Sequence, residues 1–200
     1  MRYEAILFDF DGVLVDSEPV HFECWREILQ DFDIELDWNT YSDHGIGVSD
    51  RDLMGLLCQR AGRPHDVDRV IAEFPRKKEL FRRHMREAPP FTADVLELLP
   101  QLRDYQLAVV TSSSQAEVEP ILLHAGVDGC FRTIVYGNDV KRLKPAPDPY
   151  LLAMERLGVG TALAVEDSDA GEASARAAGL DVLRIPTQSR MPELLRQRLA

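Results

Sequence analysis

The chain has 200 residues, of which 45% are hydrophobic and 28% are charged, so it has the composition of a soluble globular protein and not of a disordered one. Its formal net charge of −11 argues against nucleic-acid binding, which requires a basic surface. Three cysteines without a Cys-x-x-Cys spacing indicate reduced thiols, and neither a disulfide framework nor a zinc site is expected.

The first predicted element is a short buried strand that leads directly into carboxylates. The apolar run Ala5–Phe8 is typical of a strand buried on both faces in a parallel sheet. Side chains two apart on an extended chain share a face, so Asp9 and Asp11 should project together from the carboxyl end of the strand, where open α/β sheets bind ligands. Gly12 permits a sharp turn there. Alone, the segment could equally be a solvated turn with helix-capping aspartates.

Residues 17–89 show helical spacing and no strand pattern, so we expect an all-helical domain inserted after the first strand. Helices are predicted from Ser17 to Phe32, from Ser49 to Gly62, and from Asp66 to Phe74, with a break or kink at Pro75 before a continuation to Glu87. The last helix carries a basic run, interpreted as a solvated face and alternatively as an attractor of a phosphorylated substrate: Arg76, Lys77, Lys78, Arg82, Arg83 and Arg86.

From Thr92 onward, helices and strands alternate, which predicts an α/β core of residues 1–16 and 90–200 with a doubly wound, Rossmann-like parallel sheet. The expected strands are 107–110, 133–136, 162–165 and 182–185. The expected helices are 93–103, a second one after Ser114 that ends at Ala125, 148–157 and 168–178, with a last, peripheral helix from Pro192. Pro100 and Pro120 fall inside helical patterns and predict kinks or early ends there.

Three further polar segments follow apolar runs: Thr111-Ser112, Lys144-Pro145 and Glu166-Asp167-Ser168. Together with Asp-x-Asp-Gly-x-x-x-Asp at 9–16, they resemble in order and spacing the four motifs of the haloacid dehalogenase superfamily of phosphotransferases. The helical insertion resembles the cap of the beta-phosphoglucomutase-like branch. The chain is thus similar to this superfamily over nearly its whole length.

Four carboxylates at one sheet edge repel each other by roughly 4 kcal/mol per pair at about 4 Å and an effective dielectric of about 20, which a bound cation would offset. Oxygen-only ligands favour a hard ion, and Mg²⁺ commonly takes one or two carboxylates. The resemblance implies that Asp9, the Asp11 backbone carbonyl and Asp167 hold Mg²⁺, with Glu166 beside them. The alternative is a purely structural ion pair with Lys144.

The resemblance also implies catalytic roles. Asp9 would be the nucleophile that forms an aspartyl-phosphate, and Asp11 the general acid and base. Thr111 and the Ser112 amide would bind phosphoryl oxygens, unless these hydroxyls only cap a helix, and Lys144 would supply fixed positive charge.

Substrate selection is expected to lie in the cap, at His21, Gly47, Ser49 and Arg51. The loop departs from the mutase pattern, because Asp50 stands where that pattern has Arg, while Ile46 and Ser114 stand where it has Lys. Losing a fork-shaped phosphate clamp matters more to a mutase, which holds a second phosphate, than to a phosphatase.

We therefore predict a Mg²⁺-dependent phosphatase acting on a small phosphorylated metabolite, specifically a sugar phosphate. A phosphomutase is the nearest alternative, and a response-regulator-like phosphorylation switch is a remoter one; a dehalogenase would dispense with the second aspartate and the metal. Because the apolar run before Asp9 is too short for a signal-peptide core and no later stretch has the length of a membrane span, the cytoplasm is the expected compartment. No membrane or nucleic-acid partner is expected, and the protein should be a monomer or weak dimer.

Overall fold

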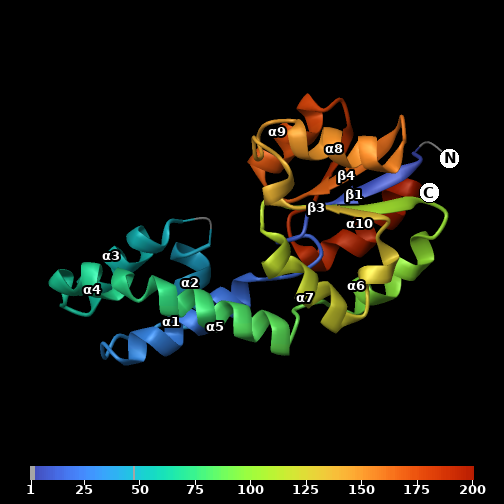
Figure 1. Cartoon of the computed structure of the whole chain (residues 1–200). Coiled ribbons are helices and arrows are strands. Elements are labelled where there is room, and N and C mark those ends of the chain that lie inside the picture. Colours follow the sequence, from blue (N-terminus) through green and yellow to red (C-terminus); the bar gives the residue numbers. More distant parts are fainter. Residues whose placement is uncertain (1–2, 47) are drawn as a thin grey trace. The chain divides into compact units, whose positions relative to one another are not determined.

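The computed structural model describes residues 3–46 and 48–200, and the chain divides into two compact units. One unit comprises 1–16 and 89–200 and contains a sheet covered by helices; the other comprises 17–88 and, in its described residues, consists of helices without strands (Figure 1). Nowhere in 3–46 or 48–200 is there a helix with the length and apolar character needed to span a bilayer.

The sheet has five parallel strands in the order β3-β2-β1-β4-β5: β1 (Ala5–Phe8), β2 (Gln106–Val110), β3 (Thr133–Val135), β4 (Ala162–Glu166) and β5 (Asp181–Arg184). The first strand is thus central, and the chain winds outward to β3 before it returns to the other side of β1. Phe8 lies in register with Val109 on β2 and Val165 on β4, so the residues after these strands meet at one edge. This edge is the switch point at which doubly wound sheets bind ligands. The predicted α/β fold with a parallel sheet is confirmed.

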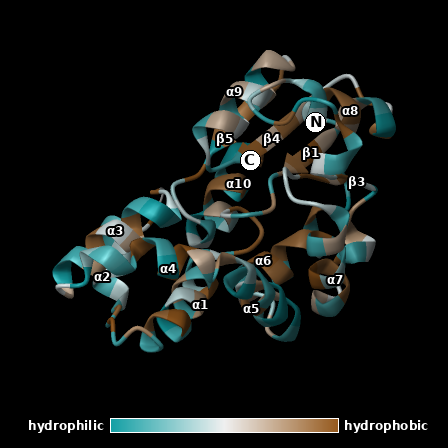
Figure 2. Cartoon of the chain, turned by 60° about the vertical axis from the view of Figure 1, so that its left-hand side comes forward, coloured by the Kyte–Doolittle hydropathy of each residue, from teal (hydrophilic) through white to brown (hydrophobic). Residues whose placement is uncertain are grey.

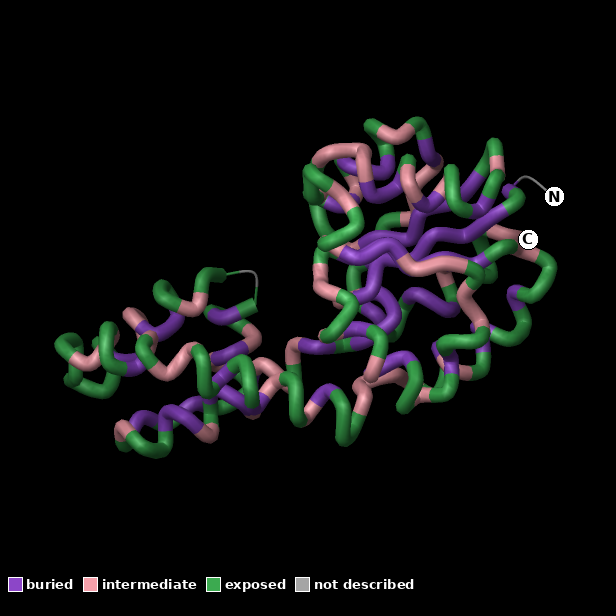
Figure 3. The backbone as a smooth tube through the Cα atoms, viewed as in Figure 1, coloured by how far each residue is buried: buried purple, intermediate pink, exposed green. Residues whose placement is uncertain are grey.

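Both faces of the sheet are covered, so its central strands are mostly buried (Figure 3), and they are apolar except for Gln106 at the start of β2 and Glu166 at the end of β4. Helices α8 (Asp148–Leu157) and α9 (Asp169–Ala177) lie on one face, while α6 (Ala93–Leu98), α7 (Gln115–Ala125) and α10 (Met191–Leu199) lie on the other (Figure 1). Alternate strand residues, including Ala5, Leu7 and Ala108, pack with α8 and α9 in one buried cluster. Short 3₁₀ turns connect these elements at Leu99–Leu102, Asp128–Cys130, Gly137–Asp139 and Gln188–Arg190.

The two prolines inside helical patterns have different effects, and one expectation about this unit is wrong. Helix α7 runs through Pro120 to Ala125, the end expected for it, whereas α6 ends early at Leu98 and is followed by a 3₁₀ turn that contains Pro100. Helix α10 is not peripheral, because Met191 and Leu195 are completely buried.

The helical unit contains α1 (Glu18–Gln30), α2 (Trp38–His44), α3 (Asp50–Arg60), a 3₁₀ turn (Pro64–Asp66), α4 (Val67–Ala72) and α5 (Phe74–Glu87). Sequence spacing missed α2, a seven-residue helix whose start is fixed by the Asp37 carboxylate accepting a hydrogen bond from the Thr40 amide. The expected break before α5 is present, and Pro75 lies in the first turn, where proline is tolerated.

The helical unit has its own apolar core, to which α1 contributes Phe22, Trp25, Ile28 and Leu29. Helix α5 is predominantly hydrophilic, as Figure 2 shows, yet Lys77 within it is only 6% exposed. Its ammonium lies 5.6 Å from the ring centroid of Trp25 and 5.7 Å from that of Phe74. The interpretation of the whole basic run as a solvated face is therefore wrong for Lys77, whose charge is held among aromatic rings.

Candidate active site

Asp9 follows β1 directly and is paired with Lys144. The Asp9 amide donates to the Val165 carbonyl at 3.0 Å, which continues the sheet pairing by one residue and fixes the backbone. The Lys144 ammonium donates to Asp9 Oδ1 at 2.6 Å, to Glu166 Oε1 at 2.6 Å and to the Val110 carbonyl at 2.8 Å. All three of its N–H groups are therefore used, and the ammonium is fixed between two carboxylates.

Glu166, the last residue of β4, is completely buried and accepts four hydrogen bonds. Its Oε1 accepts from Lys144 and from the Tyr150 hydroxyl at 2.6 Å. Its Oε2 accepts from the Asp167 amide and the Ser168 hydroxyl, each at 3.2 Å. Four donors satisfy a buried carboxylate that would otherwise be costly to desolvate.

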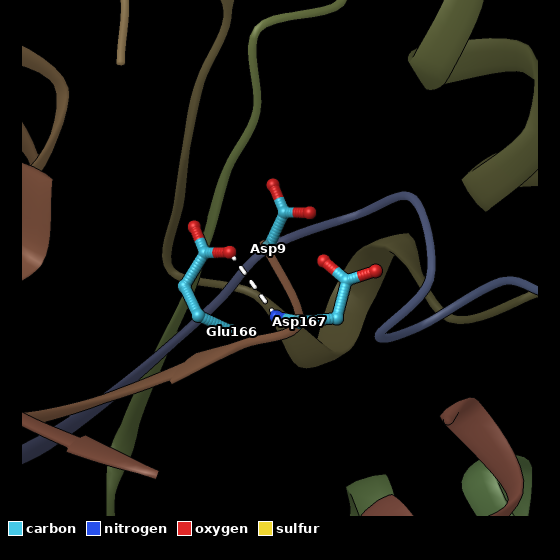
Figure 4. Close-up of side chains that lie close together, drawn as sticks. All are labelled: Asp9, Glu166 and Asp167. Carbon is cyan, nitrogen blue, oxygen red and sulfur yellow. Dashed lines mark hydrogen bonds between the residues drawn. The ribbon is translucent and has the colours of Figure 1, made fainter. Parts of the chain in front are cut away.

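Asp9, Glu166 and Asp167 each present a carboxylate oxygen, and these oxygens lie within 4.8 Å of one another. Figure 4 shows the three carboxyl groups turned toward the same region beyond the strand ends. Gly12 makes room for one of them, because a Cβ there would overlap the Asp167 carboxylate. An all-oxygen set of this kind fits a hard divalent cation such as Mg²⁺.

Burial and mutual repulsion disfavour the charged forms of two of these groups. Burial, followed by the charge of Glu166, raises the pKa of Asp9 to about 7, against the opposing effect of the Lys144 ammonium. Burial and the Glu166 charge also raise the pKa of Asp167 to about 6. A cation at this position would favour ionisation of both carboxylates.

Asp11 is not one of these three clustered carboxylates, and its side chain contacts the segment that follows β2. Its Oδ2 accepts a hydrogen bond from the Ser113 hydroxyl at 3.2 Å. Ser113 is in turn oriented by Thr111, whose buried Oγ1 accepts from the Ser113 amide at 3.0 Å. The Asp11 side chain thus contacts the segment after β2, and its charge contributes to the raised pKa of Asp9.

The serines in the segment after β2 have different surroundings. Ser114 belongs to α7, because its amide and hydroxyl both donate to Glu117 Oε2, at 3.1 and 2.7 Å. Ser112 is exposed, and a side chain at Gly137 would overlap its carbonyl. Since Ser114 serves the helix start, Thr111 and Ser112 are not needed as its caps.

The predicted cap residues have separate environments in the helical unit. Ser49 accepts from the Asp52 amide at 3.2 Å and caps α3, and Arg51 forms an exposed ion pair with Asp68 at 2.6 Å. His21 stacks on Phe81 with ring centroids 4.2 Å apart. Gly47 lies outside the described residues.

His21 lines a cavity of about 240 Å³ within the helical unit. Its Nδ1 is buried without a hydrogen-bond partner among the described residues. Asp50, on the same cavity, accepts from Trp25 Nε1 at 2.8 Å and lies 3.7 Å from the Lys77 ammonium. The sequence did not predict Lys77 as a cavity residue, because it is one of several basic residues that lie close together in α5.

Sequence reasoning also missed Tyr150 and Ser113. Tyr150 is buried on the apolar face of α8, where a tyrosine needs a hydrogen-bond partner for its hydroxyl. A single polar-tipped residue on that otherwise apolar face was the available signal. Ser113 is one of three consecutive serines, and nothing in the sequence distinguishes it from its neighbours.

Comparison with known proteins assigns the class. A model of the family described as haloacid dehalogenase-like hydrolase matches residues 6–185, so this chain belongs to that family. The resemblance inferred from the four motifs and the prediction of a hydrolase are confirmed.

Three relatives illustrate the range of activities close to this chain. Fructose-1-phosphate phosphatase YqaB of Escherichia coli (strain K12) is 31% identical over 192 residues, covering 92% of this chain and 97% of the relative. A phosphorylated carbohydrates phosphatase of Thermotoga maritima is 32% identical over 184 residues, covering 89% and 82%. Beta-phosphoglucomutase of Bacillus subtilis (strain 168) is 28% identical over 188 residues, covering 88% and 80%.

Proposed function

We propose that this protein is a Mg²⁺-dependent phosphatase that hydrolyses a small phosphorylated carbohydrate through an aspartyl-phosphate on Asp9. The observation that carries the proposal is the arrangement of Asp9 between the Lys144 ammonium and the Asp167 carboxylate at the sheet's switch point. The similarity to two phosphatases of phosphorylated sugars supports the substrate class.

In the proposed first step, Asp9 attacks phosphorus with its Oδ2, because Oδ1 is held by Lys144. A bond forms between Oδ2 and phosphorus, and the bond from phosphorus to the sugar oxygen breaks. Asp11 transfers its proton to that leaving oxygen as general acid. Mg²⁺ bound by Asp9, Asp167 and the Asp11 carbonyl would offset the charge of the phosphoryl oxygens.

In the second step a water attacks the same phosphorus, Asp11 takes up the proton of that water, and the bond to Asp9 breaks to give free phosphate. Thr111 and the Ser112 amide would donate hydrogen bonds to the phosphoryl oxygens. Lys144 keeps positive charge beside the nucleophile through both steps, which is the main form of assistance in phosphoryl transfer. The helical unit, as the cap of residues 17–88, would select the sugar, with His21 among the selecting residues.

The decisive experiment is incubation with hexose 1- and 6-phosphates and with p-nitrophenyl phosphate, with and without MgCl₂, and with free phosphate as the readout. We expect phosphate release that requires Mg²⁺ and that Asp9→Asn reduces by at least about a thousandfold, since it removes the nucleophile. Asp104→Asn, at an exposed position, is the matched control. Activity of Asp9→Asn above a tenth of wild type would contradict the assignment.

A phosphomutase is the second candidate, favoured by the similarity to beta-phosphoglucomutase. It is disfavoured by Asp50, which lines the cap cavity and stands where the mutase pattern has Arg, so the fork-shaped clamp for a second phosphate is missing at this position. The same incubation separates the two activities. Conversion of a hexose 1-phosphate to its 6-phosphate without free phosphate would establish the mutase instead.

A further inference from the structure

Tyr150 contacts the proposed site through its two buried charged residues, Glu166 and Lys144. It is completely buried on α8, and its hydroxyl donates to Glu166 Oε1 at 2.6 Å. The Lys144 ammonium donates to the same oxygen and lies 5.2 Å from the centroid of the tyrosine ring. Tyr150 therefore contacts both members of the Lys144–Glu166 pair.

These contacts leave Glu166 with little freedom. Tyr150 and Lys144 occupy Oε1, and the Asp167 amide and Ser168 hydroxyl occupy Oε2. The adjacent helix closes the remaining side, because a Cβ at Gly171 would overlap the Glu166 carboxylate. A carboxylate with two donors on each oxygen is already saturated as an acceptor.

The carboxylate of the next residue, Asp167, is not saturated with hydrogen bonds in this way. Asp167 accepts no hydrogen bond from another side chain within the described part of the chain, although its oxygen lies within 4.8 Å of oxygens of Asp9 and Glu166. The consecutive residues Glu166 and Asp167 thus differ. Glu166 is hydrogen-bonded to donors of the protein, whereas Asp167 is available to a cation.

We propose that Tyr150 is a positioning residue that acts through Glu166, committing it to Lys144 and keeping it from binding the cation as a third carboxylate beside Asp9 and Asp167. The inference rests on the cation site of the proposed function. Mg²⁺ is usually held by one or two carboxylates in strict octahedral geometry, whereas Ca²⁺ accepts six to eight oxygens and bidentate carboxylates. By restraining Glu166, Tyr150 makes the site selective for the smaller ion.

The test is calorimetric titration of the metal-free full-length protein with MgCl₂ and with CaCl₂. Tyr150→Phe removes only the hydroxyl and frees Oε1 to turn toward a cation. We expect the ratio of the Ca²⁺ to the Mg²⁺ association constant to rise at least tenfold. In turnover with MgCl₂, kcat should fall at least fivefold while KM stays within twofold, because Lys144 loses its fixed partner.

Tyr3→Phe is the matched control, since Tyr3 is also buried in the α/β unit and donates to a carboxylate, Asp181, at 2.7 Å. It should lower the denaturation midpoint comparably and leave the cation ratio unchanged. Ser168→Ala frees Oε2 instead and should shift the ratio in the same direction, so the test does not depend on one variant.

The route through Glu166 is tested by combining variants. In a Glu166→Gln background no third carboxylate exists, so adding Tyr150→Phe should leave the cation ratio within twofold of Glu166→Gln alone. A ratio in Tyr150→Phe equal to that of Tyr3→Phe overturns the proposal, and so does an effect of Tyr150→Phe that persists in the Glu166→Gln background. If the wild type itself binds no Mg²⁺, the cation site of the proposed function fails; if it binds and only the ratio is unmoved, this inference alone fails.

Discussion

At the scale of single residues, the chemistry of the site depends on which charged groups are paired with each other and which are not. Lys144 has three donors and three protein acceptors, so it behaves as a fixed charge and not as a mobile one. Asp9 has one oxygen bound to that lysine and its other oxygen without a hydrogen bond from the described residues. The free oxygen and Asp167 are the groups available to a substrate and a cation.

The first prediction concerns Asp167. Asp167→Ala should weaken Mg²⁺ binding at least tenfold, because it removes one of the carboxylates close enough to share an ion, and activity should recover partly at high MgCl₂. The measurement is the MgCl₂ dependence of phosphate release. Asp169→Ala removes an equal charge two residues away, at a fully exposed carboxylate, and should leave that dependence unchanged. An unaltered dependence in Asp167→Ala would place Asp167 outside the ligand set.

The second prediction concerns Asp11, whose carboxylate accepts a hydrogen bond from the Ser113 hydroxyl. Asp11→Asn keeps the backbone carbonyl but removes the acid and base, which should slow turnover of a sugar phosphate by about a hundred- to ten-thousandfold. With p-nitrophenyl phosphate, whose leaving group departs without a proton, rapid quenching should reveal a near-normal burst of phenolate followed by slow turnover. Absence of the burst at saturating MgCl₂ would instead assign Asp11 to positioning or cation binding.

At the scale of elements, the site is set by the junction of β4 with α9. Ser168 caps α9 by accepting from the Gly171 amide at 3.0 Å, while its hydroxyl also donates to Glu166. The helix thereby brings its first turn, with Gly171, against the carboxylate. A strand end and a helix start share one polar cluster, so a change in the helix is transmitted to the site.

The third prediction follows from this junction. Gly171→Ala should destabilise the protein by about 1–3 kcal/mol, because the new Cβ overlaps a carboxylate that four hydrogen bonds hold in place. Activity should fall at least tenfold as Glu166 and Lys144 shift. Gly55→Ala in α3 is the control: its Cβ meets open space, so helix propensity alone should stabilise by about 0.5–1 kcal/mol. Urea denaturation measures the stability change of both variants. An increase in stability for Gly171→Ala would contradict the packing argument.

At the scale of the whole molecule, the chain contains two units with separate apolar cores. Unfolding of the helical unit can be followed by itself, because both tryptophans, Trp25 and Trp38, belong to it. Tryptophan fluorescence therefore reports on unfolding of residues 17–88.

The fourth prediction uses this probe. Burial, and then the nearby Lys77 ammonium, lower the pKa of His21 from 6.5 to about 4, against the opposing charge of Asp50. Between these values the unfolded chain binds the proton and the folded unit does not, so stability falls as pH decreases from 6.5 to 4, by at most about 3 kcal/mol. Fluorescence-monitored urea midpoints at about pH 7 and about pH 4.5 should show this loss. His21→Phe keeps a ring beside Phe81 and should reduce the pH dependence, whereas His65→Gln, at an exposed position of the same unit, should not. Equal dependence in His21→Phe and wild type would exclude His21 as its source.

The parallel sheet and the order of its polar segments were predictable from local sequence pattern. Buried strands are continuous apolar runs, so β1 was located at Ala5–Phe8, where it stands, and the residues that follow such strands collect at one edge by topology alone. This is why Asp9, Lys144 and Asp167 could be selected before their distances were known. Helix α2 was not predictable, because the formation of short helices depends on packing more than on local preference.

The bonding partners of the charged groups, in contrast, are set by tertiary packing. Tyr150 and Glu166 are sixteen residues apart, Lys144 and Asp9 are 135 apart, and no local pattern pairs them. The burial of Lys77 likewise depends on rings contributed by another helix, since Trp25 lies on α1. Periodicity reports which face of an element is apolar, whereas hydrogen bonds and ion pairs depend on side-chain atoms that meet only after distant segments pack.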